Sequence, residues 1–519
     1  MPYGAYIRGV KGAIAAGHPL TALAGADVLR AGGNAVDAAV AASVASWVAE
    51  SPLTGPGGGG FMLVHRARER RTVVYDFFVS VPTGVAARPM DEIEIDFSGG
   101  STQFFRIGAA SVAVPGTVAG LEAAHRAHGS LPWRELFGPG IELALSGVVL
   151  NREQAYLHEI LDPILRHTPE SRALFERNGD RLHEGDLLRL PELVGTMELL
   201  AEGGAEELRS GDLAHAIARH VVETGGAVTE TDLADYRPIR RRPVTAPYNG
   251  YEFRSNPPPS AGGVLLAYGL RLLDAAELGD PGSPEAMTAI VEVMREQARA
   301  RDRRFARELH RGGLARRLQG EDALEAAMAR LQAGTDTPRE APLPGGTTNI
   351  SVVDAEGNAA ALSVSTGSGS GVAIPGTAIT MNNMVGEFEP EATIRPGMRM
   401  TSGMSPSVAL RDDRVRLVIG SAGSARLRNA IFQSTVNVLG HGLGVAAAIE
   451  RPRLHVEGSL VHAEGGHDED ALDALPYELA RWRERNLFFG GVSAVEVRED
   501  GTLAAAGDPR RGGHGIVVE

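Results

Sequence analysis

The sequence predicts a protein of the α+β class, and three regions of the 519-residue chain carry that prediction. Helix-like and strand-like patterns alternate through the first third. Residues 116–333 have mainly helical apolar spacing. After residue 346, short strand patterns alternate with glycine turns around one predicted helix. With 43% hydrophobic and 22% charged residues, the chain has enough apolar material for a large core.

The first third opens with two alanine-rich segments, 21–31 and 34–50, which are predicted to be helices. A Gly-Gly pair separates them, because glycine is unfavourable inside a helix. Residues 62–65 and 72–75 are short apolar runs that predict strands.

The middle of the chain is expected to be a series of helices. Apolar residues three and four positions apart predict helices over 116–128, 132–146 and 213–224. Residues 229–233 begin a further helix with a polar cap. The segment 292–332 is rich in arginine with few apolar anchors, so we expect an exposed pair of helices there.

A Pro/Gly-rich linker at 334–346 precedes a predicted β-hairpin. Residues 347–354 and 359–365 form its strands, and 355–358 form its turn. One further helix is expected near 429–439. The first hairpin strand therefore follows a flexible, exposed loop.

Composition excludes several classes of function. The formal charge of −14 argues against nucleic acid or an acidic membrane surface as a partner. The absence of cysteine excludes disulfides, thiol nucleophiles and Cys-ligated metals. No run of about 18 strongly apolar residues predicts a membrane span, and no targeting segment is visible, so a cytoplasmic location is expected.

Three segments resemble known functional motifs but lack residues or a context that those motifs require. The glycine-rich run 56–61 lacks the Lys-Ser/Thr of a phosphate loop. His125 and His128 lie three apart on a predicted helix without a third ligand, so neither a metal site nor a cofactor is expected. The run 367–371 is too rich in glycine to open the helix that a nucleophile elbow requires.

The informative feature is Gly346-Thr347, where the loop meets the strand. If the peptide bond before Thr347 is cut, the threonine hydroxyl becomes an N-terminal nucleophile. Its own α-amine, with a reference pKa near 8, can then act as the base. Taken alone, the Gly-Thr junction is a weak signal, and a β-branched residue at the start of a strand is its ordinary explanation.

A resemblance over most of the chain favours the nucleophile. The sequence resembles the γ-glutamyltransferase (γ-glutamyltranspeptidase) family of N-terminal nucleophile hydrolases, with matches that are collinear from about residue 14 to residue 511. The matching stretches are 17–20, 32–39, 57–62, 114–121, 129–133, 232–236, 242–245, 257–263, 347–354, 404–406, 420–424 and 508–510.

The resemblance implies a four-layer αββα sandwich, built as one composite domain from two segments. The precursor would cleave itself between Gly346 and Thr347 into a large segment, 1–346, and a small segment, 347–519. Thr347 would then attack a small-molecule amide to form an acyl-enzyme, which water or an amine acceptor resolves. The resemblance also allows a homodimer of processed heterodimers.

Three further positions match catalytic positions of the family. Ser365 aligns with a second hydroxyl that bonds to the nucleophile. Gly423 and Ser424 align with the oxyanion hole, where backbone N–H groups face the developing negative charge.

The sequence departs from the family where the γ-glutamyl head is bound. Phe78 replaces an arginine that pairs with the α-carboxylate, and Gly367 replaces an asparagine. Losing that charge-assisted contact, worth roughly 1.5–3 kcal/mol, lowers carboxylate recognition by about 10- to 100-fold.

The remaining head-group positions are partly retained. Asn383 is kept, Met384 replaces a glutamine, and Glu387 supplies the carboxylate that binds the α-amino group. The Ser-Ser pair of the family reads Ser402-Gly403. We therefore expect an acyl group other than γ-glutamyl, one that is less polar near Phe78 and Met384 and neutral or cationic near Glu387.

The segment 389–401 is short where many family members carry a long lid, which favours hydrolysis over transfer. Three alternatives stay open at this point. The chain is a true γ-glutamyltransferase or glutathione hydrolase, an uncleaved inactive homologue that acts as a binding protein, or a metal or nucleotide enzyme.

Overall fold

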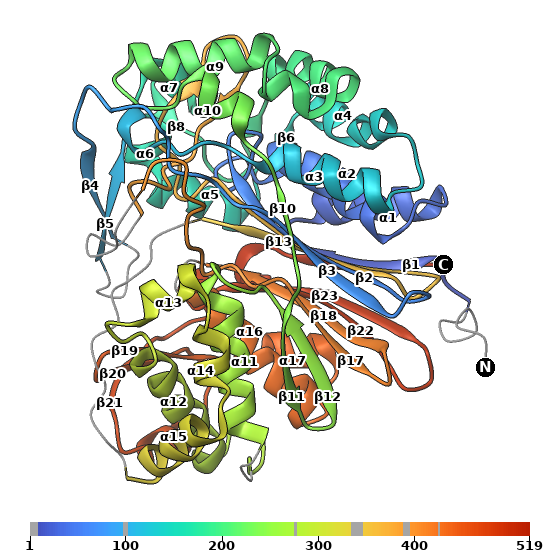
Figure 1. Ribbon diagram of the computed structural model, residues 1–519, viewed down its shortest axis with the longest axis vertical. Coiled ribbons are helices and arrows are strands. Elements are labelled where there is room, and N and C mark those ends of the chain that lie inside the picture. Colours follow the sequence, from blue (N-terminus) through green and yellow to red (C-terminus); the bar gives the residue numbers. More distant parts are fainter. Residues whose placement is uncertain (1–8, 97–101, 275–277, 334–345, 388–394, 424–425) are drawn as a thin grey trace.

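The computed structural model describes residues 9–96, 102–274, 278–333, 346–387, 395–423 and 426–519. Two β-sheets lie face to face, and a layer of helices covers the outer face of each sheet (Figure 1). The α+β class and the four-layer αββα arrangement are therefore confirmed.

The first sheet has seven antiparallel strands and contains the predicted hairpin near its centre. Its strands, in spatial order, are β10 (Ile239–Arg241), β3 (Arg71–Phe77), β2 (Gly59–Arg66), β14 (Ala359–Ser365), β13 (Thr348–Asp354), β1 (Gly12–Ala16) and β24 (His514–Val518). In the hairpin, Thr348 pairs with Val364, and β14 has the bounds that the sequence predicts.

The second sheet has six antiparallel strands. They are β11 (Val244–Tyr248), β12 (Tyr251–Ser255), β17 (Ser407–Arg411), β18 (Arg414–Ala422), β22 (Gly491–Val497) and β23 (Leu503–Gly507). Each sheet contains strands from before and after residue 346. The chain on either side of the proposed cleavage point is thus interleaved into one unit.

Helices from the first half of the chain cover the first sheet (Figure 1). They are α1 (Pro19–Arg30), α2 (Ala35–Ala49), α3 (Thr117–His128), α4 (Gly138–Ser146), α5 (Arg152–Ile160), α6 (Asp162–Leu165), α7 (Pro169–Phe175), α8 (Pro191–Gly203), α9 (Asp212–Glu223) and α10 (Glu230–Asp235). A capping box at Asn34 begins α2. The helix expected over 132–146 is divided into a 3₁₀ turn, η3 (Trp133–Phe137), and α4.

Later helices gather on the side of the second sheet (Figure 1). They are α11 (Ala261–Asp274), α12 (Pro284–Arg299), α13 (Phe305–Arg311), α14 (Leu314–Leu318), α15 (Glu321–Ala333), α16 (Arg426–Thr435) with a following π-helical turn, η5 (Val436–Gly440), α17 (Val445–Glu450) and α18 (Glu469–Asp473).

The expectation of an exposed helix pair over 292–332 is wrong for α12 and for the number of helices, whereas most residues of α13–α15 are exposed or half-buried. The segment lies in four helices, and most of α12 is buried. Its acidic residues Glu292 and Glu296 are buried as ion pairs with Arg295 and with Arg299 and Arg330, respectively. Internal charge pairing lets a strongly charged sequence occupy a packed position.

Shorter strands form peripheral ladders. They are β4 (Asp91–Asp96) with β5 (Thr102–Ile107), β6 (Val148–Val149) with β9 (Leu187–Leu188), β7 (Glu176–Arg177) with β8 (Asp180–Arg181), β15 (Ala373–Ile374) with β16 (Ile379–Thr380), and β19 (Leu454–Glu457) with β20 (Leu460–Ala463) and β21 (Glu478–Arg481). Within the described ranges, no helix is both long enough and apolar enough to cross a bilayer.

The core occupies both faces of the first sheet. Along β1, Ile14 and Ala16 pack under the helices, whereas Ala13 and Ala15 face the second sheet. Because side chains alternate along a strand, a strand covered on both faces needs apolar residues at every position. The hairpin β13–β14 lies in this covered region, and the candidate nucleophile Thr347 directly precedes its first residue, Thr348.

Candidate active site

Thr347 lies directly before β13, at one end of the central hairpin. It is 3% exposed. The preceding residue, Gly346, donates its backbone N–H to the carbonyl oxygen of Gly367 over 2.8 Å. That bond holds the predicted cleavage point against the loop that follows β14, so the peptide bond and the end of β14 face each other.

Ser365, the last residue of β14, contacts the predicted cleavage point directly. Its hydroxyl donates to the carbonyl oxygen of Gly346 and accepts the N–H of Gly367 over 2.8 Å. A donor on this oxygen polarises the carbonyl and stabilises the negative charge that forms when the carbon is attacked. The structure therefore brings together three residues that the sequence singles out: Gly346, Thr347 and Ser365.

Gly423 follows the last residue of β18, Ala422, and has a φ of 119°. A Cβ at this position would lie 2.7 Å from the Cα of Gly490. Only glycine fits this close backbone approach. Ser424, the second predicted oxyanion residue, lies outside the described residues, and the oxyanion role of the pair stays a prediction.

Beside Thr347 lies a small cavity of about 10 Å³. Thr347 lines it together with Glu50, Gln154, Ala422 and Arg511, among others. Because Ala422 directly precedes Gly423, the candidate nucleophile and the strand that leads to the candidate oxyanion residues meet at this cavity. It is about large enough for one water molecule.

Glu50, at the C-terminal end of α2, is anchored by two hydroxyl donors. Thr348 donates to its Oε2 over 2.6 Å, and Thr21 donates to its Oε1 over 2.8 Å. Burial raises the pKa of Glu50, while these hydrogen bonds and the charge of Arg511 oppose that shift. Glu50 thus ties the residue after the nucleophile to helix α2.

Arg511 is 7% exposed and lies in the 3₁₀ turn η7 (Pro509–Arg511). Its aliphatic stem packs so closely on Gly491 that a Cβ there would lie 2.4 Å from Cδ of Arg511. Burial lowers the pKa of Arg511 to about 10, and Asp508 and Glu50 oppose that shift. The guanidinium therefore keeps its positive charge at neutral pH.

A buried ionic network holds η7 in place. Asp508 accepts from Arg453 over 2.6 Å, from Arg510 over 3.1 Å and from the backbone of Val492 over 2.9 Å. Arg510 also pairs with Glu464. With every charge in this network paired, the position of the adjacent Arg511 is well determined.

Two of the predicted head-group residues converge beyond Gly367. The N–H of Ser368 is shared between Oδ1 of Asn383, at 3.1 Å, and Oε1 of Glu387, at 3.0 Å. Burial raises the pKa of Glu387 to about 8, and the bonds from Ser368 and Asn383 only partly offset the effect. No ion pair to Glu387 occurs within the described part of the chain.

Phe78 and Met384, expected as an apolar wall of the acyl pocket, are both buried core residues. The ring of Phe78 is 3% exposed and stacks on Phe61, with 5.6 Å between centroids. Its backbone oxygen accepts from Tyr236 over 2.7 Å and from Arg399. The side chain of Phe78 therefore packs in the hydrophobic core. Its contact with an acyl group stays a prediction.

The last two predicted head-group residues follow the shortened segment. The hydroxyl of Ser402 accepts the N–H of Met404 over 3.0 Å, and a Cβ at Gly403 would meet no atom within 4 Å. Residues 389–394 of the segment lie outside the described residues. Its described part runs along 79–81, where Met400 donates to the carbonyl oxygen of Val79 over 3.1 Å.

The sequence did not single out Glu50, Arg399 or Arg511. One signal was available for Glu50, which ends a helix of otherwise mostly small apolar residues. No sequence signal identified Arg511 or Arg399, because only the fold shows that these two arginines are buried. Long-range partners decide their roles, and sequence spacing does not report such partners.

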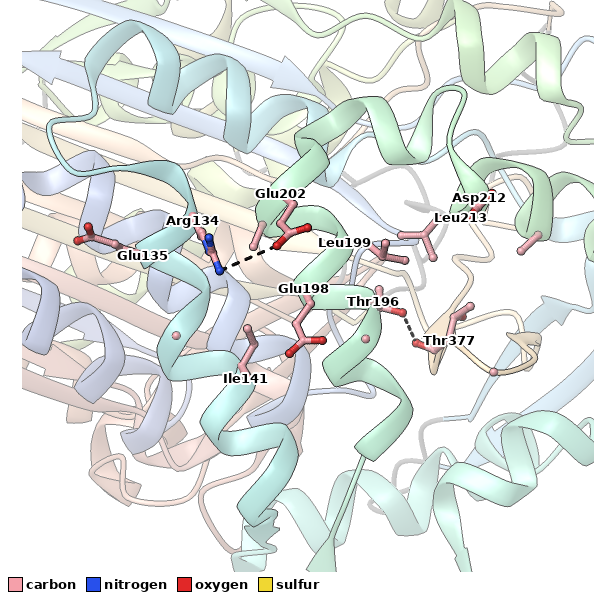
Figure 2. A pocket seen from close by; sticks show the side chains of 15 residues that line it. Arg134, Glu135, Ile141, Thr196, Glu198, Leu199, Glu202, Asp212, Leu213 and Thr377 are labelled. Atoms are coloured by element: carbon pink, nitrogen blue, oxygen red, sulfur yellow. Dashed lines mark hydrogen bonds and ion pairs between the residues drawn. The ribbon is translucent and has the colours of Figure 1, made fainter.

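Elsewhere, a surface cavity of about 1000 Å³ lies between α4, α8 and the start of α9 (Figure 2). Figure 2 shows Arg134 paired with Glu202 and Thr196 donating to the backbone oxygen of Thr377. None of the predicted site residues lines this cavity. Across the described ranges, no group of three or more His, Asp or Glu side chains is arranged to hold a metal ion.

Comparisons with known proteins identify the family. Residues 21–518 match the family model described as gamma-glutamyltranspeptidase. The glutathione hydrolase proenzyme of Escherichia coli K12 is 30% identical, over 97% of this chain and 91% of that protein. The acylase ACY 1 proenzyme of Pseudomonas sp. SE83 is 31% identical, over 98% of this chain and 94% of that protein.

The fold has a close counterpart among solved structures. A cephalosporin acylase from Bacillus halodurans superposes with a TM-score of 0.85, covering 98% of this chain and 96% of that one, at 23% sequence identity. At that identity the likeness concerns the fold.

Proposed function

Since the chain belongs to the γ-glutamyltranspeptidase family of amide-cleaving enzymes, we propose that it is a self-cleaving hydrolase or acyltransferase with Thr347 as its nucleophile. The observation that carries this proposal is the hydrogen bond from Ser365 to the carbonyl oxygen of Gly346. It places a hydrogen-bond donor at the carbonyl oxygen that becomes negative when the adjacent Thr347 hydroxyl attacks.

Self-cleavage proceeds in two steps. The Oγ of Thr347 attacks the carbonyl carbon of Gly346, the hydroxyl proton passes to the nitrogen of Thr347, the C–N bond breaks, and the acyl group has then moved from nitrogen to oxygen. Water then hydrolyses this ester, which leaves a carboxylate on Gly346 and a free α-amine on Thr347.

Turnover repeats the same chemistry on a substrate. The α-amine takes the proton of the Thr347 hydroxyl as Oγ attacks the substrate amide, and the leaving amine departs with a proton. Water or an acceptor amine then cleaves the acyl ester. Gly423 and Ser424 supply backbone N–H donors to the oxyanion in both steps.

The acyl group is neutral or cationic in this proposal, and water is the main acceptor. Glu387 offers a partly buried carboxyl to an ammonium group, whereas Phe78 stands where a carboxylate-binding arginine would be. The short segment before Ser402 supports an open site that admits water.

A true glutathione hydrolase is the second candidate. Asn383 and Glu387 stay together around Ser368, so half of a γ-glutamyl head-group site persists. The relative from Escherichia coli is a glutathione hydrolase proenzyme. An uncleaved binding protein is the third candidate.

Intact mass under denaturing conditions separates the enzyme from the binding protein. Wild type should give fragments of about 36 and about 18 kDa, proportional shares of 54.6 kDa, with the smaller one beginning at Thr347. Thr347→Ala should stay a single chain, and Thr347→Ser, which keeps the hydroxyl, should still cleave. A wild-type chain that stays intact for days at neutral pH would favour the binding protein.

A panel of acyl p-nitroanilides then separates the two enzyme candidates. The proposal expects aminoacyl or neutral anilides to react faster than γ-glutamyl-p-nitroanilide. The reverse order would identify a γ-glutamyl hydrolase.

A further inference from the structure

The cavity beside Thr347 is lined by an acidic and a basic side chain that the chemistry above does not use. Glu50 reaches it from the end of α2, and Arg511 reaches it from η7. The cavity is too small to hold bulk solvent, so screening between these charges and Thr347 is weak. Charges that face a titratable group across such a space change its protonation equilibrium.

The guanidinium of Arg511 is not fully used by the protein. Within the described structure, neither its Nε nor its Nη1 has a hydrogen-bond partner, and both atoms are buried. Gln154, on the same cavity, likewise has a buried Oε1 without a partner. The positive charge of a buried guanidinium with unpaired N–H groups has a strong electrostatic effect on groups in the cavity that it lines.

Glu50 is held differently. Its two oxygens are each fixed by a threonine hydroxyl, and a Cβ at Gly17 would lie 2.4 Å from Oε2. The carboxyl therefore stays where it is and cannot swing toward Arg511 to form a closed ion pair. The two charged groups act separately on what lies between them.

We propose that Glu50 and Arg511 together set the protonation state of the Thr347 α-amine in the cleaved enzyme. The positive charge of Arg511 favours the neutral amine, which is the form that accepts the proton of the nucleophile. The carboxylate of Glu50 favours the ammonium form. This inference rests on the proposed function, because the amine exists only after cleavage at Gly346–Thr347.

Other titratable groups face the same region. Asp508 lines the cavity, but Arg453 and Arg510 bind its carboxylate. Glu387 lies on the far side, beyond Gly367. These groups are common to the wild type and the variants below, so a difference between variants isolates Glu50 and Arg511.

The sequence offers a direct way to titrate this amine. Lys11 is the sole lysine of the chain, so the cleaved small segment has one primary amine, the α-amine of Thr347. Trace labelling with an amine-reactive acetyl ester over a pH series, followed by intact mass of the small segment, gives the pKa of that amine without turnover.

Two substitutions should move this pKa in opposite directions. Arg511→Met removes the positive charge and keeps the stem, so the pKa should rise by about one unit from the wild-type value. Glu50→Gln keeps the shape and one acceptor oxygen, so the pKa should fall, by up to about one unit. The acid limb of kcat/KM should shift in the same direction in each variant.

Arg511→Lys is the matched control. It keeps the positive charge, so the acid limb should stay near that of wild type. This variant is used for kinetics alone, because it adds a second amine to the small segment. If the Arg511→Met variant does not cleave itself, the Glu50→Gln variant alone tests the proposal, which requires that this substitution lower the pKa of the Thr347 α-amine.

The possible failures are distinguishable. A wild-type chain without a cleaved small segment would defeat the proposed function itself. Cleaved variants whose labelling curves coincide with that of wild type, even with lower kcat, would show a merely structural role and overturn the inference. Shifts in the same direction for both substitutions would overturn it as well.

Discussion

The hydroxyl of Ser365 donates a hydrogen bond to the carbonyl oxygen of Gly346, the residue before the candidate nucleophile. The two residues are 19 positions apart in sequence, and the β13–β14 hairpin brings them together. Under the proposed function, this bond acts on the scissile carbonyl of the uncleaved chain, and cleavage leaves the same hydroxyl beside Thr347.

Ser365→Ala should slow self-cleavage by about 10²–10³-fold, the usual cost of removing one oxyanion donor. Ser365→Thr keeps the hydroxyl and should cleave at a rate close to that of wild type. The fraction of cleaved chain over time, measured by intact mass after rapid purification, gives both rates. An unchanged rate for Ser365→Ala would mean that its hydrogen bond does not act on the scissile carbonyl.

Glu387 should make the binding of cationic acyl groups depend on pH. Burial raises its pKa to about 8, so the free carboxyl is mostly neutral at pH 7 and becomes charged as the pH rises. KM for a 5-aminopentanoyl anilide should therefore increase by up to about tenfold for each pH unit below 8. The substrate ammonium stays charged throughout this range.

The matched comparison is the pentanoyl anilide, which lacks the ammonium group and should show no such trend in KM. Glu387→Gln should flatten the pH dependence for the charged substrate. Equal pH dependence of KM for both substrates would show that Glu387 does not bind the acyl head.

Restoring an arginine at position 78 should not restore γ-glutamyl recognition. Phe78 is buried against Phe61, and nearby Asp76 already pairs with Arg241. Phe78→Arg would bury a new charge and remove the ring stacking, which should lower the free energy of unfolding by about 3–5 kcal/mol.

Urea unfolding measures this change, with Phe78→Leu as the milder apolar control. A Phe78→Arg protein with an unchanged midpoint and faster γ-glutamyl-p-nitroanilide cleavage would show that position 78 faces the acyl site.

Thr348→Val should destabilise the fold by about 1–3 kcal/mol, because it removes the hydroxyl that donates to Oε2 of Glu50. Valine has nearly the same shape as threonine, so the decrease in the free energy of unfolding reports the loss of the hydrogen bond to the buried carboxyl of Glu50. Thr102→Val, on the exposed side of β5, is the control and should change little. Equal unfolding midpoints for the two variants would mean that another donor replaces Thr348.

Local patterns in the sequence account for much of the fold. The alanine-rich segments are α1 and α2, and the hairpin after the linker is β13–β14, because caps, glycines and alternation act over a few residues. The burial of α12 was not predicted, because it depends on contacts with residues that are distant in the sequence. Ion pairs join α12 to α15 across more than 30 residues, as Arg330 with Glu296 shows.

The same difference between local and long-range information applies to the candidate site. By itself, the sequence determined the residue types at the Gly346-Thr347 junction, at Ser365 and at Phe78, and its resemblance to the family predicted their roles, because each is a matter of residue type at a motif position. The tertiary structure decided that Phe78 packs in the core, and that Glu50 and Arg511 line the cavity beside Thr347. Burial and electric field depend on groups that are distant in sequence, and only the folded chain brings those groups together.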